Sequence, residues 1–243
     1  MKNSIMANST KYQSNFLILL VIFYILTFPL VGIMLHKPII LGPLHLQVSS
    51  LIYPLGFFFA DLITEVYGYQ VSRQLIWCQI PGTIYYQTIL LTALYSLPTP
   101  TGWTHQIDYD YVFGGLGIIG FFGDFGLVLA FFLNNYLISK WKIFLKGKHF
   151  WLRSIGASAL GESIQLFIGL IGVALSKIWP LDYIVMLFFN VLLFRLLMTA
   201  VLSVPASFFA FYLKKFDRID VYDNSTNFNP FKFSIQANLK EKS

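Results

Sequence analysis

The stretch FLILLVIFYILTFPLVGIML, residues 16–35, is twenty residues long and contains no charged side chain. A helix of that length spans about 30 Å, which matches the hydrocarbon core of a bilayer. A secretory signal peptide would have a shorter apolar core and a small-residue cleavage site, and neither is present. The sequence therefore predicts a first transmembrane helix that is retained in the protein.

The composition of the whole chain agrees with this interpretation. Of the 243 residues, 56% are hydrophobic and only 12% are charged, whereas a soluble domain carries about 25% charged residues. Aromatic residues reach 18%, which is typical of lipid-facing surfaces and interfacial belts. These figures exclude a disordered chain, a coiled coil and a disulfide scaffold, and Cys78 is the sole cysteine.

Five further apolar segments follow, separated by proline and glycine, and they are too long and too evenly apolar for barrel strands. We expect them at residues 46–66, 75–97, 113–139, 157–178 and 183–213. The fold class expected is all-α, a polytopic membrane protein with six transmembrane helices. The expected organisation is an N-terminal segment, a transmembrane domain and a C-terminal tail, at residues 1–15, 16–213 and 214–243.

The distribution of basic residues predicts the orientation. With the N-terminus inside, fourteen of the 17 Lys and Arg residues fall on the inner side, and only Lys37 and Lys177 fall outside. This bias predicts that both termini are cytoplasmic. It also explains the net charge of +6 without nucleic acid, because the basic, aromatic stretch 140–153 becomes a cytoplasmic loop. The lipid bilayer is the partner that the composition indicates.

Ionisable side chains within the expected spans are the candidates for function, because an unpaired charge in a bilayer costs several kcal/mol. Polar amides in the same spans could join them. The ionisable residues are Asp61, Glu65, Asp124, Glu162 and Arg195, and the amides include Gln79, Gln87, Asn134 and Gln165.

Helical spacing groups several of these residues. Asp61 and Glu65 lie one turn apart on one helix face, and so do Glu162 and Gln165. Asn134 lies toward the inner end of its helix, so we expect one polar site in the inner half of the membrane. Asp61 and Glu162 lack enough basic partners in the spans and favour a ligand site, whereas Glu65 could instead be interfacial.

Asp124 and Arg195 lie at similar depths in two helices that run in the same direction. A structural ion pair between them is therefore expected, either as packing support or as part of the site. Breaking such a buried pair typically costs about 3–5 kcal/mol.

The motifs of common enzyme classes are missing from the sequence. It has no H-E-x-x-H pattern, no Cys/His cluster, no phosphate-binding loop and no G-x-S-x-G elbow. We therefore expect no enzyme activity, no metal site and no cofactor.

The stretch FFFADLITEVYGY, residues 57–69, followed by Arg73, closely resembles the signature of the queuosine precursor transporter family, also called the vitamin-uptake-transporter-like family. Weaker matches lie at residues 151–162 and 220–231. Gln165 and Arg195 stand where the family pattern has an acid and a lysine. The resemblance implies an inner-membrane carrier that imports queuine or a 7-deazaguanine, such as preQ0 or preQ1, for tRNA modification.

The resemblance implies a planar, guanine-like ligand with two parallel hydrogen-bond donors on one edge. The carboxylate of Asp61 or Glu162 would accept both, Gln165 would contact the carbonyl edge, and aromatic rings would stack on the face. The substrate-binding residues expected are Tyr53, Phe58, Asp61, Glu65, Asn134, Glu162, Gln165 and Arg195.

An alternative hypothesis remains for the function. The chain could be the membrane-embedded substrate-binding subunit of a multi-component vitamin or nucleobase importer, since it has no ATP-binding loop of its own. The sequence also leaves a homo-oligomer open.

Overall fold

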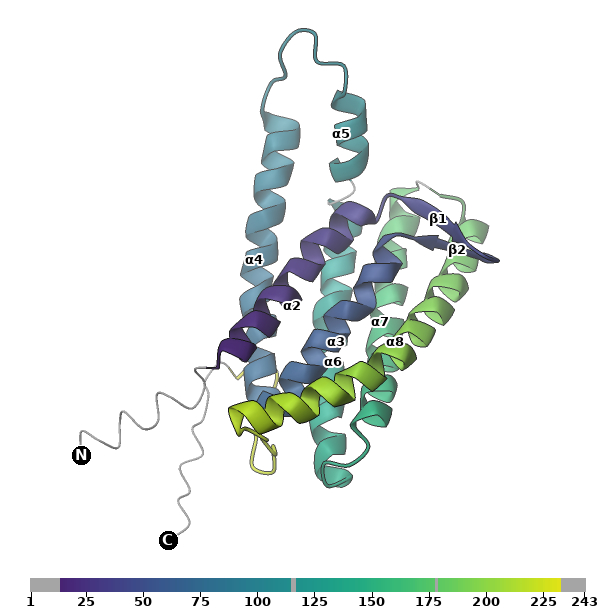
Figure 1. Ribbon diagram of the computed structural model, residues 1–243. Helices are drawn as coiled ribbons and strands as arrows, with labels where there is room; N and C mark the ends of the chain where they lie inside the picture. The colour runs from purple at the N-terminus through teal and green to yellow at the C-terminus, as the bar shows by residue number, and fades with distance from the viewer. Residues whose placement is uncertain (1–13, 115–116, 178, 233–243) are drawn as a thin grey trace, which may run out of the picture.

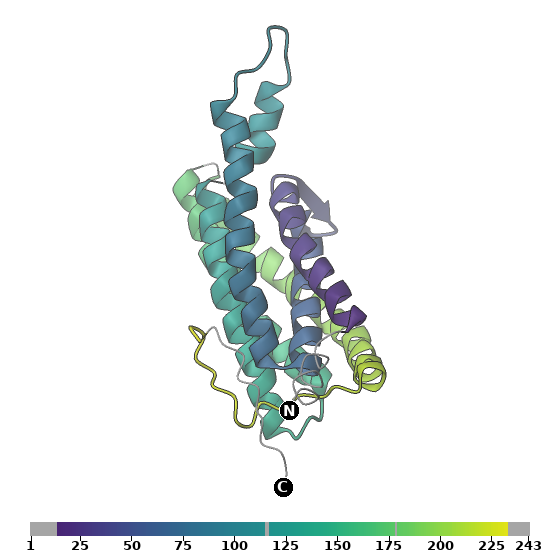
Figure 2. The same cartoon turned by 90° about the vertical axis from the view of Figure 1, so that its left-hand side faces the viewer.

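The computed structural model describes residues 14–114, 117–177 and 179–232. Long helices lie side by side in a bundle, and the segment joining α4 to α5 projects beyond the rest at one end (Figures 1 and 2). The helices are α2 (Asn15–Met34), α3 (Ser49–Tyr67), α4 (Tyr69–Ser96), α5 (Gln106–Phe113), α6 (Ile118–Phe144), α7 (Phe150–Ser176) and α8 (Leu181–Asp217). A short antiparallel hairpin, β1 (Pro38–Leu41) and β2 (Leu44–Gln47), joins α2 to α3.

The helices have the length and surface that a bilayer requires. Within the described residues, five helical segments are long and apolar enough to cross a membrane. The helix α4 has 28 residues but a more polar sequence, with Gln79 and Gln87 in its middle. Large apolar side chains such as Ile18, Leu26 and Phe208 are exposed on the outside of the bundle, as lipid contact requires. The expectation of a multi-pass helical membrane protein is therefore confirmed.

Several expected boundaries differ from the structure. The expected helix at 46–66 begins only at Ser49, because Leu46 belongs to the hairpin, where Gly42 adopts φ +60° in a two-residue turn. The expected helix at 113–139 is shifted to Ile118–Phe144, and α5 precedes it as a separate helix. Residues 1–13, Ile178 and residues 233–243, which belong to other expected segments, lie outside the described residues.

Gly68 makes the turn between α3 and α4, and it explains one position of the 57–69 motif. Its φ of +87° strongly favours glycine, and an added Cβ would lie 2.7 Å from Cγ1 of Val221. The chain can therefore reverse tightly while the segment after α8 passes against the turn. The backbone N–H of Val221 donates to the carbonyl of Val66, which fixes that segment in place (3.2 Å).

The segment after α8, residues 218–232, forms a strap across the end of the bundle opposite the hairpin, and we call that end the strap end. Asp223 accepts a hydrogen bond from the backbone N–H of Tyr69 (2.9 Å). Arg73, the basic residue that follows the motif, donates to the carbonyls of Asn227 and Asn229 (2.9 Å each). The strap therefore holds the start of α4 near the end of α8 through buried polar contacts.

The most extensive helix–helix contact among the described residues joins α6 to α7. At Gly161 of α7, an added Cβ would lie 3.1 Å from the backbone carbonyl of Ala130 and 2.8 Å from Cε1 of Phe57. Small residues allow helix backbones to approach closely in a membrane, where no hydrophobic effect drives helices together. This contact fixes the depth of Glu162, the next residue along α7.

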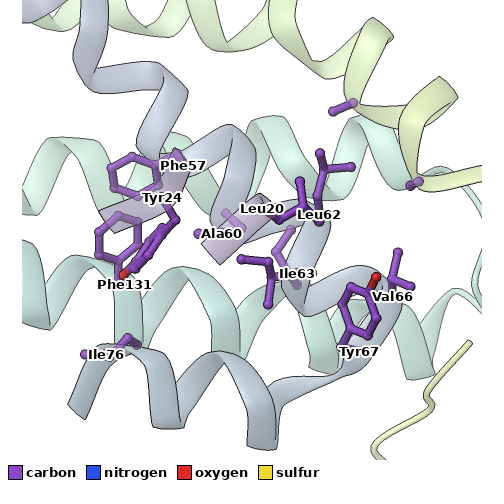
Figure 3. Close-up of a cluster of buried hydrophobic side chains, with 14 of the residues drawn as sticks. Leu20, Tyr24, Phe57, Ala60, Leu62, Ile63, Val66, Tyr67, Ile76 and Phe131 are labelled. Carbon is purple, nitrogen blue, oxygen red and sulfur yellow. The ribbon is translucent and has the colours of Figure 1, made fainter. Parts of the chain in front are cut away.

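Aromatic rings fill the centre of the bundle (Figure 3). Phe57 of α3 packs on Phe131 of α6 with ring centroids 4.7 Å apart, and Tyr24 lies 5.3 Å from the same ring. Phe28 packs edge-on against both Tyr24 and Phe131. We call Tyr24, Phe28, Phe57 and Phe131 the aromatic floor, because they separate the two halves of the bundle described below.

Candidate substrate cavity

A cavity of about 320 Å³ lies between α2, α3, α4, α6, α7 and α8, on the hairpin side of the aromatic floor. Phe28 of the floor lies on its wall, and Gln47 and Ser49 mark its hairpin side. Pockets for small ligands typically have about 300–1,000 Å³, so this cavity suits one small molecule. Most of its wall is apolar, and the polar groups come from residues of the hairpin and of α3, α4, α6, α7 and α8.

Asp124 is the carboxylate on this wall. Its Oδ2 accepts a hydrogen bond from Nε2 of Gln87 (2.5 Å), and within the described chain its Oδ1 has no hydrogen-bond partner. Gln79 lies two turns from Gln87 on α4, closer to the strap end. Its side-chain oxygen accepts a hydrogen bond from the hydroxyl of Tyr24 (2.6 Å), and its amide N–H₂ has no partner among the described residues. The α4 and α6 side of the cavity thus offers an acceptor and a donor.

Arg195 supplies the positive charge on the opposite side. Its Nη1 donates to Oε1 of Gln165 (2.8 Å), and its guanidinium lies over the ring of Tyr53, 3.9 Å from the centroid. All three residues line the cavity and are almost fully buried. Among the described residues, Nε of Arg195 and the hydroxyl of Tyr53 have no hydrogen-bond partner. This side of the cavity therefore combines a cation with unused polar atoms.

The expected ion pair between Asp124 and Arg195 does not form directly. Both residues lie on the cavity wall, but Asp124 bonds to Gln87 and Arg195 bonds to Gln165. The prediction of a direct ion pair used depth along two helices, whereas contact also depends on how the two side chains are placed around the cavity. A carboxylate and a guanidinium on one cavity wall favour a ligand that contacts both.

Asp61, the acid at the centre of the 57–69 motif, lies on the strap side of the aromatic floor. It accepts hydrogen bonds from Asn134 (2.6 Å) and Ser158 (3.1 Å), and also from Ser154. A crevice of about 10 Å³ touches Asp61 and Phe58, and neither residue lines the larger cavity. Neutral donors on α6 and α7 thus satisfy this buried carboxylate.

Glu65 forms an ion cluster at the strap end with three cations. Arg153 holds both carboxylate oxygens (2.8 and 3.1 Å), Lys214 donates to Oε1 (2.6 Å), and Lys142 lies 3.8 Å away. Asp220 of the strap bonds to both lysines (2.6 and 2.9 Å). We call these five residues the Glu65 cluster. It joins α3, α6, α7, α8 and the strap, and it buries Glu65 among protein groups.

Glu162 is fully buried between these two regions. Its Oε1 accepts a hydrogen bond from the hydroxyl of Thr199 (3.1 Å), and its Oε2 has no hydrogen-bond partner in the part of the chain that the structure describes. It does not line the larger cavity, although Gln165, one turn away on the same face, does.

The expected substrate-binding residues therefore divide among different places. The structure brings Tyr53, Gln165 and Arg195 together on the cavity wall, whereas Phe58, Asp61, Glu65, Asn134 and Glu162 lie outside it. The cavity also lies on the hairpin side of the bundle and not in the half where the carboxylates suggested a site. The sequence interpretation did not assign a role to Gln79 and Gln87, although polar amides two turns apart in an apolar helix were a usable signal.

Comparison with known proteins bears on the role of this bundle. A family model described as "Putative vitamin uptake transporter" matches residues 47–215, which is more than half of the chain. The chain belongs to this family. The match covers α3 to α8 with the cavity, and it assigns this vitamin uptake transporter family member a transport role in a membrane. No curated relative and no solved structure matches the chain.

Proposed function

We propose that this family member imports a queuosine precursor, either queuine or a 7-deazaguanine such as preQ0 or preQ1, across the cell inner membrane for tRNA modification. The expected orientation, with both termini cytoplasmic, places the hairpin and the cavity on the outer side and the strap on the inner side. The basic residues of the Glu65 cluster and the strap gather at one end, as the positive-inside rule would require.

The observation that carries the proposal is the free carboxylate oxygen of Asp124 in a small, mostly apolar cavity. A 7-deazaguanine presents a ring N–H and an exocyclic amine side by side, and a carboxylate is the acceptor that suits both. We assign this role to Asp124 and not to Asp61 or Glu162, because those two carboxylates lie outside the cavity.

The opposite side of the cavity suits the carbonyl edge of such a ring. Arg195 and the amide of Gln165 can donate to a carbonyl oxygen, and the aromatic residues Phe28 and Tyr86 line the wall. Stacking of a base on an aromatic side chain is worth about 1–3 kcal/mol. The amide and guanidinium at positions 165 and 195 also replace the acid and lysine of the family pattern, so we expect selectivity among precursors to depend on them.

The test is uptake in cells that cannot make the precursor and must acquire it from the medium. Cells with the wild-type protein should regain queuosine in their tRNA when 7-deazaguanines or queuine are supplied. Asp124→Asn should reduce this rescue at limiting ligand by about tenfold or more, because hydrogen bonds to charged groups are worth about 1.5–3 kcal/mol.

Asp110→Asn is the matched control, since Asp110 is an exposed acid of α5 that bonds to Gln106 outside the cavity. Full rescue by Asp124→Asn would contradict the assignment of the cavity, and no rescue by the wild-type protein would contradict the substrate. The purified chain in liposomes should also transport without added ATP. Transport that requires a copurified ATPase would instead favour the multi-component importer.

A further inference from the structure

Three carboxylates, those of Asp61, Glu65 and Glu162, are buried among the described helices. They differ in the hydrogen bonds and cations that stabilise their negative charge. Glu65 has three cations around it, and Asp61 accepts hydrogen bonds from three neutral donors. Within residues 14–114, 117–177 and 179–232, Glu162 has one hydroxyl donor, Thr199, and one carboxylate oxygen without a hydrogen-bond partner. An ionised carboxylate in an apolar interior is strongly disfavoured unless it is paired. Of these three carboxylates, Glu162 thus accepts the fewest hydrogen bonds among the described residues.

Glu162 also lies between two polar regions, the substrate cavity and the small crevice beside Asp61. On the cavity side, its neighbours are Arg195 and Gln165, which line the cavity. On the strap side, Thr199 donates to Glu162 and also lines the small crevice that contains Asp61 and Ser158. A crevice of about 10 Å³ has room for about one water molecule. Glu162 therefore connects the substrate cavity with the Asp61 region.

Arg195 is the charged group that Glu162 shares with the cavity. The two side chains interact electrostatically without forming an ion pair within 4 Å, and Nε of Arg195 has no hydrogen-bond partner. Loss of a proton from Glu162 would strengthen its attraction for Arg195 and draw the guanidinium away from Gln165 and Tyr53. Protonation would release Arg195 to the cavity wall.

The remaining groups around Glu162 leave Arg195 as its cationic partner. From α3, Asp61 adds a second negative charge, and Tyr53 is a neutral phenol that also interacts with Glu162. From α8, Thr199 is neutral, and from α6, Asn134 is bonded to Asp61 and Ser158. Among the described residues, the balance between charged and neutral Glu162 therefore depends chiefly on the position of Arg195.

We propose that the carboxyl group of Glu162 is a proton-binding site that couples proton entry to substrate transport through Arg195. This inference rests on the proposed function, since the substrate must occupy the cavity. A proton from the outer solution binds Glu162, Arg195 then contacts the ligand, and the proton leaves toward the inner side after the ligand departs. The driving force is the transmembrane proton gradient, and no covalent step is involved.

The experiment uses the full chain in liposomes, with radiolabelled 7-deazaguanine as the probe. With one coupled proton, an inside-alkaline gradient of about one pH unit supports at most about tenfold accumulation. The wild-type protein should accumulate the probe under this gradient, and a protonophore should abolish accumulation. Glu162→Gln should lose accumulation and keep counterflow exchange, because exchange does not require a net proton movement. Ser163→Ala is the control, since Ser163 bonds only to the carbonyl of Ala159 on the same helix.

The outcomes separate this proposal from the proposed function. Counterflow by the wild-type protein without any response to the gradient overturns the proton site and leaves the transport role intact. Accumulation by Glu162→Gln at the wild-type level also overturns it. Absence of wild-type counterflow overturns the proposed function and this inference together.

Thr199→Val provides a second test if Glu162→Gln does not fold. This variant removes the hydroxyl donor of the charged carboxylate and keeps the volume of the side chain. Because the charged form loses its hydrogen bond, the midpoint of the pH dependence of uptake should move to higher pH. An unchanged midpoint would overturn the proposal, since a purely structural loss would lower the rate at every pH.

Discussion

Glu65 and Arg153 form a bidentate ion pair that is completely buried at the strap end of the bundle. The two residues are 88 positions apart in the sequence, and they join α3 to α7. Lys214 of α8 and Lys142 of α6 complete the contact. Four helices and the strap therefore meet at one carboxylate, on the side of the aromatic floor that faces away from the cavity.

Replacing Glu65 should be strongly destabilising. Glu65→Gln leaves Arg153 without its carboxylate and the two lysines with Asp220 alone, and loss of one partner of a buried pair typically costs about 3–5 kcal/mol. Asp108→Asn is the control, because Asp108 forms an exposed pair with His105 and should matter little. Unfolding in mixed detergent micelles checks both, and equal stability of the two variants would contradict the role of the cluster.

The strap should depend on Arg73. Arg73→Met removes two hydrogen bonds to strap carbonyls, so residues 219–232 should exchange their amide protons faster in hydrogen-exchange mass spectrometry. Lys215→Met, at an exposed position near the end of α8, should leave that exchange unchanged. Faster exchange in both variants, or in neither, would show that Arg73 does not hold the strap.

The Glu65 cluster also predicts a pH dependence through Asp220. Partial burial alone would raise the pKa of Asp220, but hydrogen bonds and charges from Lys142 and Lys214 lower it below its ordinary value of 3.8. A carboxyl whose pKa is lower in the folded state stabilises the protein above the unfolded pKa, and this contribution disappears as the pH falls through the folded pKa.

Unfolding of wild-type protein and Asp220→Asn between about pH 3 and pH 7 checks this pH dependence. The variant should be less stable at neutral pH, and the difference should shrink toward the acidic end. A difference that grows as the pH falls would have the wrong sign for this ion cluster.

The contact between α6 and α7 should not tolerate a larger residue at position 161. Gly161→Ala places a methyl group against a backbone carbonyl that cannot move alone, so we expect destabilisation of about 1–3 kcal/mol. Gly82→Ala is the comparison, because nothing lies within 4 Å of its added Cβ. In a helix, that change should be neutral or stabilise by up to about 1 kcal/mol, as thermal unfolding in detergent would show.

The sequence allowed the helical membrane fold to be predicted, because apolar length and punctuation are local properties. Residues 16–35 and α2 (Asn15–Met34) differ by one position at each end. The sequence did not predict the hairpin, because its two strands are short and adjoin an apolar helix. Gly42 and Pro43 marked the turn, but they equally suit a loop between helices.

The site was harder to predict, because a charged side chain in a span can either bind a ligand or pair with a residue of a neighbouring helix. Glu65 and Asp61 are equally conspicuous in the sequence, but their partners come from Arg153, Ser154 and Ser158, about 90 positions away. Spacing along one helix gives the face and the depth, and it does not reveal which groups on other helices satisfy the charge. Tyr53 was placed at the site as a stacking ring for the implied ligand, Gln165 by its helix face and Arg195 by its depth. Gln87 was given no role.

Binding of radiolabelled 7-deazaguanine to the purified protein in detergent tests the central claim most directly, because it requires neither transport nor orientation. Wild-type protein and Asp110→Asn should bind alike, and Asp124→Asn should bind at least about tenfold more weakly, because the ring edge loses a charged acceptor. Equal affinity of Asp124→Asn and wild type, or no binding by the wild-type protein, would contradict the account.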